Sequence, residues 1–303
     1  MLKFQVINYR KHAAILSLLI IVIGIISLAI NGLNLGIDFT GGTVLHLRLG
    51  ETFEESEVRD ILAEFDLEGS FIQNVGDEGL TQGERDEVVI RTVSLKEEER
   101  QEIIGAFQER WSITDDDIIR VENVGGVIGE ELTRSAFWAL LIATLGMIAY
   151  ITIRFEFKFA VSAIAALVHD LIILLAVFSL FRIEINSPFV AAILTIFGYS
   201  INDTIVVFDR IRENLKEMKK YGYRDIVNHS INQTIVRSIN TSVTTLLVLS
   251  ALYIFGGIPL RPFIAALLVG VISGTYSSLF VASPLWVTWK DWEQSKRRKT
   301  KEA

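Results

Sequence analysis

Three ionisable residues stand inside stretches of the chain that are otherwise apolar: Asp170, Asp203 and Arg237. A charged side chain at the centre of a membrane-spanning helix costs about 3 kcal/mol or more, and such residues usually mark ion or proton pathways. Burial opposes ionisation of a carboxylate and a nearby guanidinium favours it, so the two influences can balance. The chemistry that these residue types offer is therefore the uptake and release of a proton within a membrane.

Asp203 and Arg237 are predicted to lie at comparable depth on adjacent antiparallel helices and to form an ion pair. Polar side chains recur at helical spacing around both residues, which predicts a polar seam in a helix bundle. The members of this seam are Tyr199, Ser200, Asn202 and Thr204 around Asp203, and Asn240, Thr241 and Thr244 around Arg237. Two alternatives stay open: a static structural ion pair, and an interfacial Arg237 whose side chain reaches water.

Asp170 lies near the centre of its apolar stretch and directly follows His169. One interpretation places its carboxylate on the same proton pathway. The other gives it only hydrogen bonds between helices. For His169 a packing or hydrogen-bonding role is favoured over a role as proton carrier.

Six apolar stretches are long enough to cross a bilayer, which takes about 20 residues. Half of the chain is hydrophobic, and the mean hydropathy is +0.41, which is typical of a membrane protein. The predicted spans are residues 13–30, 135–153, 159–181, 188–208, 237–255 and 263–289. A cleaved signal peptide is the competing interpretation of the first stretch, but no small-x-small cleavage site follows it.

Basic residues predict the orientation of these spans, because cytoplasmic segments are enriched in lysine and arginine. The clusters lie in residues 3–11, 154–158, 210–224 and 290–301, which all fall on one side if there are six spans. The sequence therefore predicts cytoplasmic N- and C-termini. The predicted division is residues 1–32 (N-terminus and first span), 33–134 (external domain), 135–290 (spans two to six) and 291–303 (basic tail).

The stretch between the first two spans has the pattern of a separate α+β domain. Residues 43–49, 70–75, 87–93 and 118–124 read as strands, residues 54–65 read as a helix, and a second helix follows Ser94. Capping boxes are predicted at Thr52 with Glu55 and at Ser94 with Glu97. The order βαββαβ predicts a ferredoxin-like domain, with both helices on one face of the sheet. A Gly- and Asp-rich loop is expected between the second and third strands.

Several functional classes find no support in the sequence. The chain has no cysteine, which excludes disulfides, thiolate metal sites and a cysteine nucleophile. The acidic runs at residues 97–99 and 115–117 lack the spacing of a calcium loop. No catalytic constellation, phosphate loop or nucleic-acid signature appears, so we expect no enzyme, no cofactor and no metal.

Four motifs together resemble the SecF family of protein-export proteins. They are residues 33–42 (LNLGIDFTGG), residues 168–170 (VHD), residues 198–214 (GYSINDTIVVFDRIREN) and residues 237–242 (RSINTS). The resemblance covers nearly the whole chain, in the order and topology of the family. It implies a polytopic α-helical membrane protein with six transmembrane helices and a ferredoxin-like external domain, in a bacterial inner membrane.

The resemblance also implies partners and a role. SecF proteins pair with SecD, and the pair is similar to one transporter of the resistance–nodulation–division superfamily. Expected partners are SecD, the SecYEG channel, a YajC-like accessory subunit and the translocating unfolded polypeptide. The implied function is proton-driven promotion of late protein translocation, with Asp203 and Arg237 on the proton pathway and Asp170 matching a family motif. Half of a small-molecule or lipid exporter, or a passive scaffold of the Sec complex, are the alternatives.

Overall fold

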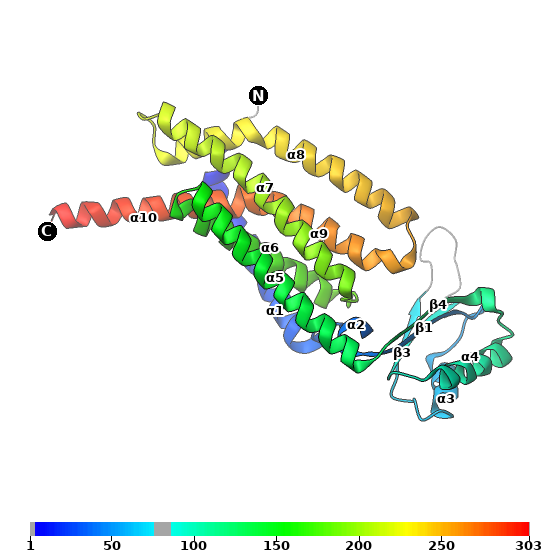
Figure 1. The fold of residues 1–303 in the computed structure, drawn as a ribbon. Coiled ribbons are helices and arrows are strands. Elements are labelled where there is room, and N and C mark those ends of the chain that lie inside the picture. Colours follow the sequence, from blue (N-terminus) through cyan, green and yellow to red (C-terminus); the bar gives the residue numbers. More distant parts are fainter. Residues whose placement is uncertain (1–3, 76–85, 303) are drawn as a thin grey trace. The chain divides into compact units, whose positions relative to one another are not determined.

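The computed structural model describes residues 4–75 and 86–302, which form two compact units (Figure 1). One unit consists of residues 1–34 together with 138–303, and the other of residues 35–137. The loop predicted to be rich in Gly and Asp falls on residues 76–85, outside the described residues.

The first unit is built from helices that are long and apolar enough to span a membrane. Within the described residues there are six such spans, as the sequence predicts. They correspond to α1 (Arg10–Asn31), α5 (Gly126–Arg154), α6 (Phe157–Leu180), α7 (Ser187–Glu217), α8 (Tyr223–Phe255), and α9 (Arg261–Ser277) continued by α10 (Ser283–Glu302). A short 3₁₀-helix, η1 (Val6–Tyr9), precedes α1, and another, η3 (Ile258–Leu260), precedes α9.

Helix α8 begins well before the predicted span, so the expectation that Arg237 opens its helix is wrong. The polar first half of α8 packs against the end of α7, where the buried Asn214 donates to Ser230 Oγ and to Gln233 Oε1 at 2.8 Å each. A hydropathy window leaves this half out of the predicted span because its residues are polar. Their polar groups are satisfied by hydrogen bonds to another helix.

The last span is interrupted by a π-helical turn, η4 (Ser278–Ala282), between α9 and α10. Before this turn, a Cβ atom on Gly270 would lie 2.2 Å from Ile196 of α7, and one on Gly274 would lie 3.0 Å from the Ser200 Cβ. These two glycines thus let α9 approach α7 closely. After the turn, the fully buried Trp286 stacks on Phe159 of α6, with ring centroids 4.8 Å apart.

The second unit contains a four-stranded antiparallel sheet in the order β2-β3-β1-β4. Its elements are β1 (Gly42–Arg48), α3 (Glu55–Ala63), β2 (Phe71–Val75), β3 (Glu87–Thr92), α4 (Glu97–Trp111), η2 (Asp115–Asp117) and β4 (Ile118–Val124). This is the predicted βαββαβ order, in which β3 separates β1 from β2. Alternate residues of β1, Leu45 and Leu47, pack with Phe107 of α4 in the core.

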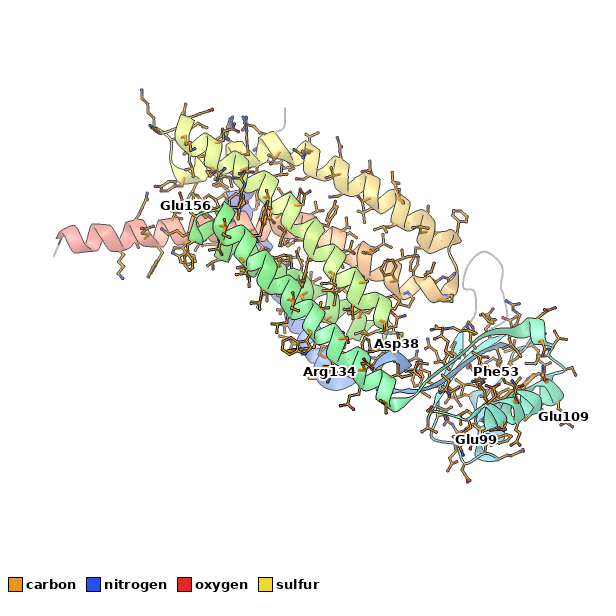
Figure 2. All side chains as sticks on the ribbon, viewed as in Figure 1. Asp38, Phe53, Glu99, Glu109, Arg134 and Glu156 are labelled. Atoms are coloured by element: carbon orange, nitrogen blue, oxygen red, sulfur yellow. The ribbon has the colours of Figure 1, made fainter. Side chains whose placement is uncertain are left out.

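The N-cap residues of both helices in this unit lie two residues later than the predicted capping boxes place them. The N-cap residues are Glu54 and Lys96, whose backbone N–H groups donate to Glu57 and Glu99, so the boxes expected at Thr52 and Ser94 are wrong. Ser94 instead donates to Asn123 of β4. Phe53 lies inside the unit, whereas the acidic side chains of Glu99 and Glu109 on α4 lie at its surface (Figure 2).

The backbone conformation at the start of β1 explains the two adjacent glycines there. Gly41 and Gly42 have φ values of +70° and +130°, which side-chain-bearing residues rarely adopt. A Cβ atom on Gly42 would also lie 2.4 Å from the Thr92 carbonyl oxygen. The pair is therefore required where the chain passes the short helix α2 (Ile37–Thr40) and enters the sheet.

Candidate functional site

Asp203 is buried on α7, where its carboxylate accepts two hydroxyl hydrogen bonds. Ser238 Oγ of α8 donates at 2.6 Å, and Ser278 Oγ, the first residue of η4, donates at 2.5 Å. The side chain is 8 % exposed. Three separate elements of the bundle therefore meet at this carboxylate.

Arg237 does not pair with Asp203, which corrects the predicted ion pair. The Arg237 side chain is exposed, and no ion pair joins the two residues in the part of the chain that the structure describes. The reason is helical geometry, because consecutive residues on an α-helix point about 100° apart. Ser238 takes the inward position on α8, and Arg237 faces out of the unit.

The predicted polar seam divides between the inside and the outside of the bundle. Tyr199 and Ser200 contact inward partners, with the Tyr199 hydroxyl donating to Ser242 at 3.0 Å and Ser200 donating to Asp170 at 2.7 Å. Thr204 is also buried. The others are exposed: Asn202 on α7, and Asn240, Thr241 and Thr244 on α8. The α8 residues share the outward face of Arg237.

Asp170 forms a second buried carboxylate site at the centre of the unit. The residue is 1 % exposed, and its carboxylate accepts hydrogen bonds from three hydroxyls on two other helices. Ser200 of α7 and Ser277 of α9 donate to Oδ2 at 2.7 Å each, and Ser273 of α9 donates to Oδ1 at 2.6 Å. The His169 ring lies beside the same Oδ1 atom.

The two carboxylates are linked through one segment of the last span. Ser277 donates to Asp170, and the next residue, Ser278, donates to Asp203. The change from α9 to the π-turn falls between these two serines. π-turns often occur at functional sites. A change in either carboxylate therefore acts directly on the same peptide segment.

The hydroxyl donors Ser238, Ser273 and Ser277 were not identified from the sequence. Serine is common in membrane helices, where it usually donates to its own helix backbone. The one available signal is the stripe of small residues on α9, formed by Gly270 and Gly274, which lets α9 pack closely against α7. That packing brings the serines to the carboxylates.

The chain matches two family models. One, described as "Protein export membrane protein SecD/SecF, C-terminal", matches residues 107–292, and the other, "SecD/SecF GG Motif", matches residues 26–52. The second match contains Gly41 and Gly42, whose backbone conformation requires glycine.

Curated proteins and solved structures agree with these matches. The chain is 42 % identical to "Protein translocase subunit SecF" of Alicyclobacillus acidocaldarius, over 95 % of this chain and 93 % of that protein. It is 39 % identical to "Protein translocase subunit SecDF" of Bacillus subtilis, over 97 % of this chain but 39 % of that protein.

A crystal structure of SecDF from Thermus thermophilus, described as a translocon-associated membrane protein, superposes with a TM-score of 0.86 at 38 % identity. The superposition covers 96 % of this chain and 39 % of that longer one. With these matches, the chain belongs to the SecD/SecF family of protein-export membrane proteins, as a subunit of the SecF type.

Proposed function

We propose that this chain is the SecF half of a SecD–SecF machine that uses the proton-motive force to promote late translocation through the SecYEG channel. Family membership assigns the chain to protein export and to transport proteins, not to enzymes. The observation that supports proton coupling is a carboxylate, Asp203, that is buried among membrane-spanning helices and held by hydroxyl groups from two of them. A YajC-like subunit and the unfolded substrate complete the proposed set of partners.

Protonation of Asp203 would change the contacts of three elements at once. An ionised carboxylate only accepts hydrogen bonds, whereas a protonated one also donates. Ser238 and Ser278 both donate to the ionised form, so a proton on one oxygen requires the serine bound there to turn or to move away. Moving one charge through the membrane potential provides about 2.3 kcal/mol per 100 mV, which is enough to bias a two-state arrangement.

SecD is the proposed neighbour of the outward face of α8. Arg237, Asn240, Thr241 and Thr244 are all exposed there, and a charged or polar face toward lipid is unfavourable. The SecDF relatives carry the matched region together with a longer remainder in a single chain. Asp203 and Asp170 would then form the inner part of the proton pathway, and Arg237 would act at the contact with SecD.

The test is protein translocation into membrane vesicles with and without a proton gradient. Asp203→Asn has nearly the shape of the protonated side chain and cannot release a proton, so the stimulation by the gradient should be lost. Asp209→Asn is the matched control, because Asp209 lies on the same helix but pairs with Arg212 at a half-exposed site. Full stimulation in Asp203→Asn vesicles would contradict the proposal and leave a scaffold role.

A further inference from the structure

His169 and Asp170 are consecutive on α6, and the His169 ring lies between Asp170 and a hydroxyl of α1. Ring atom Nδ1 lies 3.2 Å from Asp170 Oδ1, and Nε2 lies 3.1 Å from Ser17 Oγ. The side chains of His169 and Asp170 are both buried. Every polar atom of this pair thus faces a protein group whose ability to donate or accept can be assigned.

The direction of the hydrogen bonds on the Ser17 side follows from proton counting. The Tyr276 hydroxyl has one proton and donates it to the Ala13 carbonyl oxygen at 2.9 Å, since a carbonyl only accepts. In the 3.1 Å contact between Tyr276 and Ser17, the donor is therefore Ser17. Ser17 then accepts from His169, and Nε2 of the ring carries a proton.

The Asp170 side has a complete set of donors for an ionised carboxylate. Such a group has about four lone-pair sites on its two oxygens. Ser200 and Ser277 fill those of Oδ2, and Ser273 fills one of Oδ1. The remaining contact on Oδ1 is His169 Nδ1, so this nitrogen donates as well. With protons on both nitrogens, the ring is an imidazolium cation.

Charge balance leads to the same assignment. In the described part of the chain, the His169 ring is the one cationic group at ion-pair distance from Asp170. On α7 and α9 the nearest ionisable side chains along the chain are Tyr199, Asp203 and Tyr276, and none of these is a cation. An ionised Asp170 beside a neutral ring would be a buried, uncompensated charge, which is strongly unfavourable.

We propose that His169 and Asp170 together hold one exchangeable proton, carried on His169 Nδ1 in the arrangement described, as a second proton-binding site of the bundle. Loss of this proton leaves a lone pair on Nδ1 facing the carboxylate, so the contact must open. The ring is bonded to α1 and the carboxylate to α7 and α9, and these helices would respond. The coupling of this proton to export rests on the proposed function. The presence of the proton on His169 does not rest on it.

The first test measures protonation directly. The full chain, with ¹⁵N-labelled histidine, is studied together with its SecD partner in lipid vesicles by solid-state NMR. Only four histidines are present, so loss of one ring signal in His169→Gln assigns it. We expect protons on both ring nitrogens of His169. Isotope-edited infrared difference spectra against Asp170→Asn should show an ionised carboxylate.

A neutral His169 ring overturns the proposal whatever the state of the carboxyl group, and so does a charged ring beside a protonated carboxyl group. This measurement needs no translocation assay, and the wild-type chain alone can decide it. It therefore stands even where a variant does not fold.

The second test asks whether this proton takes part in export. His169→Gln keeps a side-chain amide that can reach Ser17 but removes the proton that Nδ1 exchanges. It should lose the gradient-dependent increment of translocation, while His229→Gln, at an exposed position of α8, should retain it. If Asp203→Asn loses the increment and His169→Gln keeps it, proton coupling through Asp203 stands and the proposed coupling of the second site to export is overturned. If both keep it, the proposed function fails as well.

Discussion

Serine hydroxyls, and not basic side chains, make the hydrogen bonds to the Asp203 carboxylate and most of those to the Asp170 carboxylate. Hydroxyls stabilise a carboxylate without cancelling its charge, so binding of a proton makes the site neutral, whereas it would leave a site paired with arginine positively charged. An arginine salt bridge would hold the carboxylate ionised more firmly. For a residue that must gain and lose a proton, a hydroxyl environment is the more reversible arrangement.

A further buried titratable group lies in the sheet of the second unit. His46 of β1 is 3 % exposed and contacts Glu87 of β3, with Nε2 and Oε2 3.0 Å apart. Burial lowers the pKa of His46 below its ordinary value of 6.5, and the hydrogen bond and charge of Glu87 only partly oppose this. Below that pH the unfolded chain binds more protons at this histidine than the folded unit does.

The stability of this unit should consequently fall as the pH is lowered below about 6.5. The slope of the free energy of opening against pH should decrease in His46→Gln, which cannot titrate. Hydrogen exchange of the β1 amides in the full chain, corrected for intrinsic rates, measures this between about pH 7.5 and 5.5. The exposed His229→Gln variant is the control. Equal slopes in wild type and His46→Gln would contradict the assignment.

At the scale of the helices, the close approach of α9 to α7 depends on glycine. A methyl group at Gly270 would overlap Ile196, so Gly270→Ala should destabilise the bundle by about 1–3 kcal/mol. Gly146→Ala in α5 is the matched control, because a Cβ atom there meets nothing within 4 Å. Denaturation of the purified chain measures both variants, and Ile196→Ala should restore part of the loss in the double variant.

Equal stability of the Gly270 and Gly146 variants would show that α9 can move away from α7 at little cost. The carboxylate sites would then not depend on the contact between Gly270 and Ile196.

The helices and strands were largely predictable, and the direction in which single residues face was not. Hydropathy identifies the six spans, and alternating periodicity identifies the sheet. Whether Arg237 or Ser238 points inward depends on the rotation of α8, which the polar contacts of its first half with Asn214 help to set. The sequence shows these polar residues but not the helix that satisfies them. Asp170 and Asp203 were identifiable because charge is rare in a span; their serine partners were not.

At the scale of the whole molecule, orientation in the membrane remains the principal prediction. The described basic clusters and the sheet of the second unit should lie on opposite sides of the membrane if six spans are crossed. The chain has no cysteine, so single cysteines can be introduced without background. One exposed position is available in each part of the chain that this prediction separates: Lys219 between α7 and α8, and Glu98 on α4.

We expect a membrane-impermeant maleimide to label Glu98→Cys in intact spheroplasts and Lys219→Cys only after the membrane is opened. Labelling of both in intact cells would contradict the six-span arrangement. Labelling of Lys219→Cys alone would invert it and place the acidic unit in the cytoplasm. A cysteine-free wild-type chain is the control for non-specific reaction.

The π-turn between α9 and α10 also determines how the chain tolerates changes in length. A turn closed by i→i+5 hydrogen bonds holds one residue more than an α-helical turn. Removing one residue from Ser278–Ala282 would turn it into an α-helical turn and leave α9 and α10 close to their present phase, whereas removing one residue from α9 or α10 would rotate all that follows by about 100°. In the first case Trp286 would keep its stack on Phe159, and Ser273 and Ser277 would keep their places. A one-residue deletion should therefore be accepted more readily in this turn than in the helices beside it, and the contact that it puts at risk is the hydrogen bond from Ser278 to Asp203.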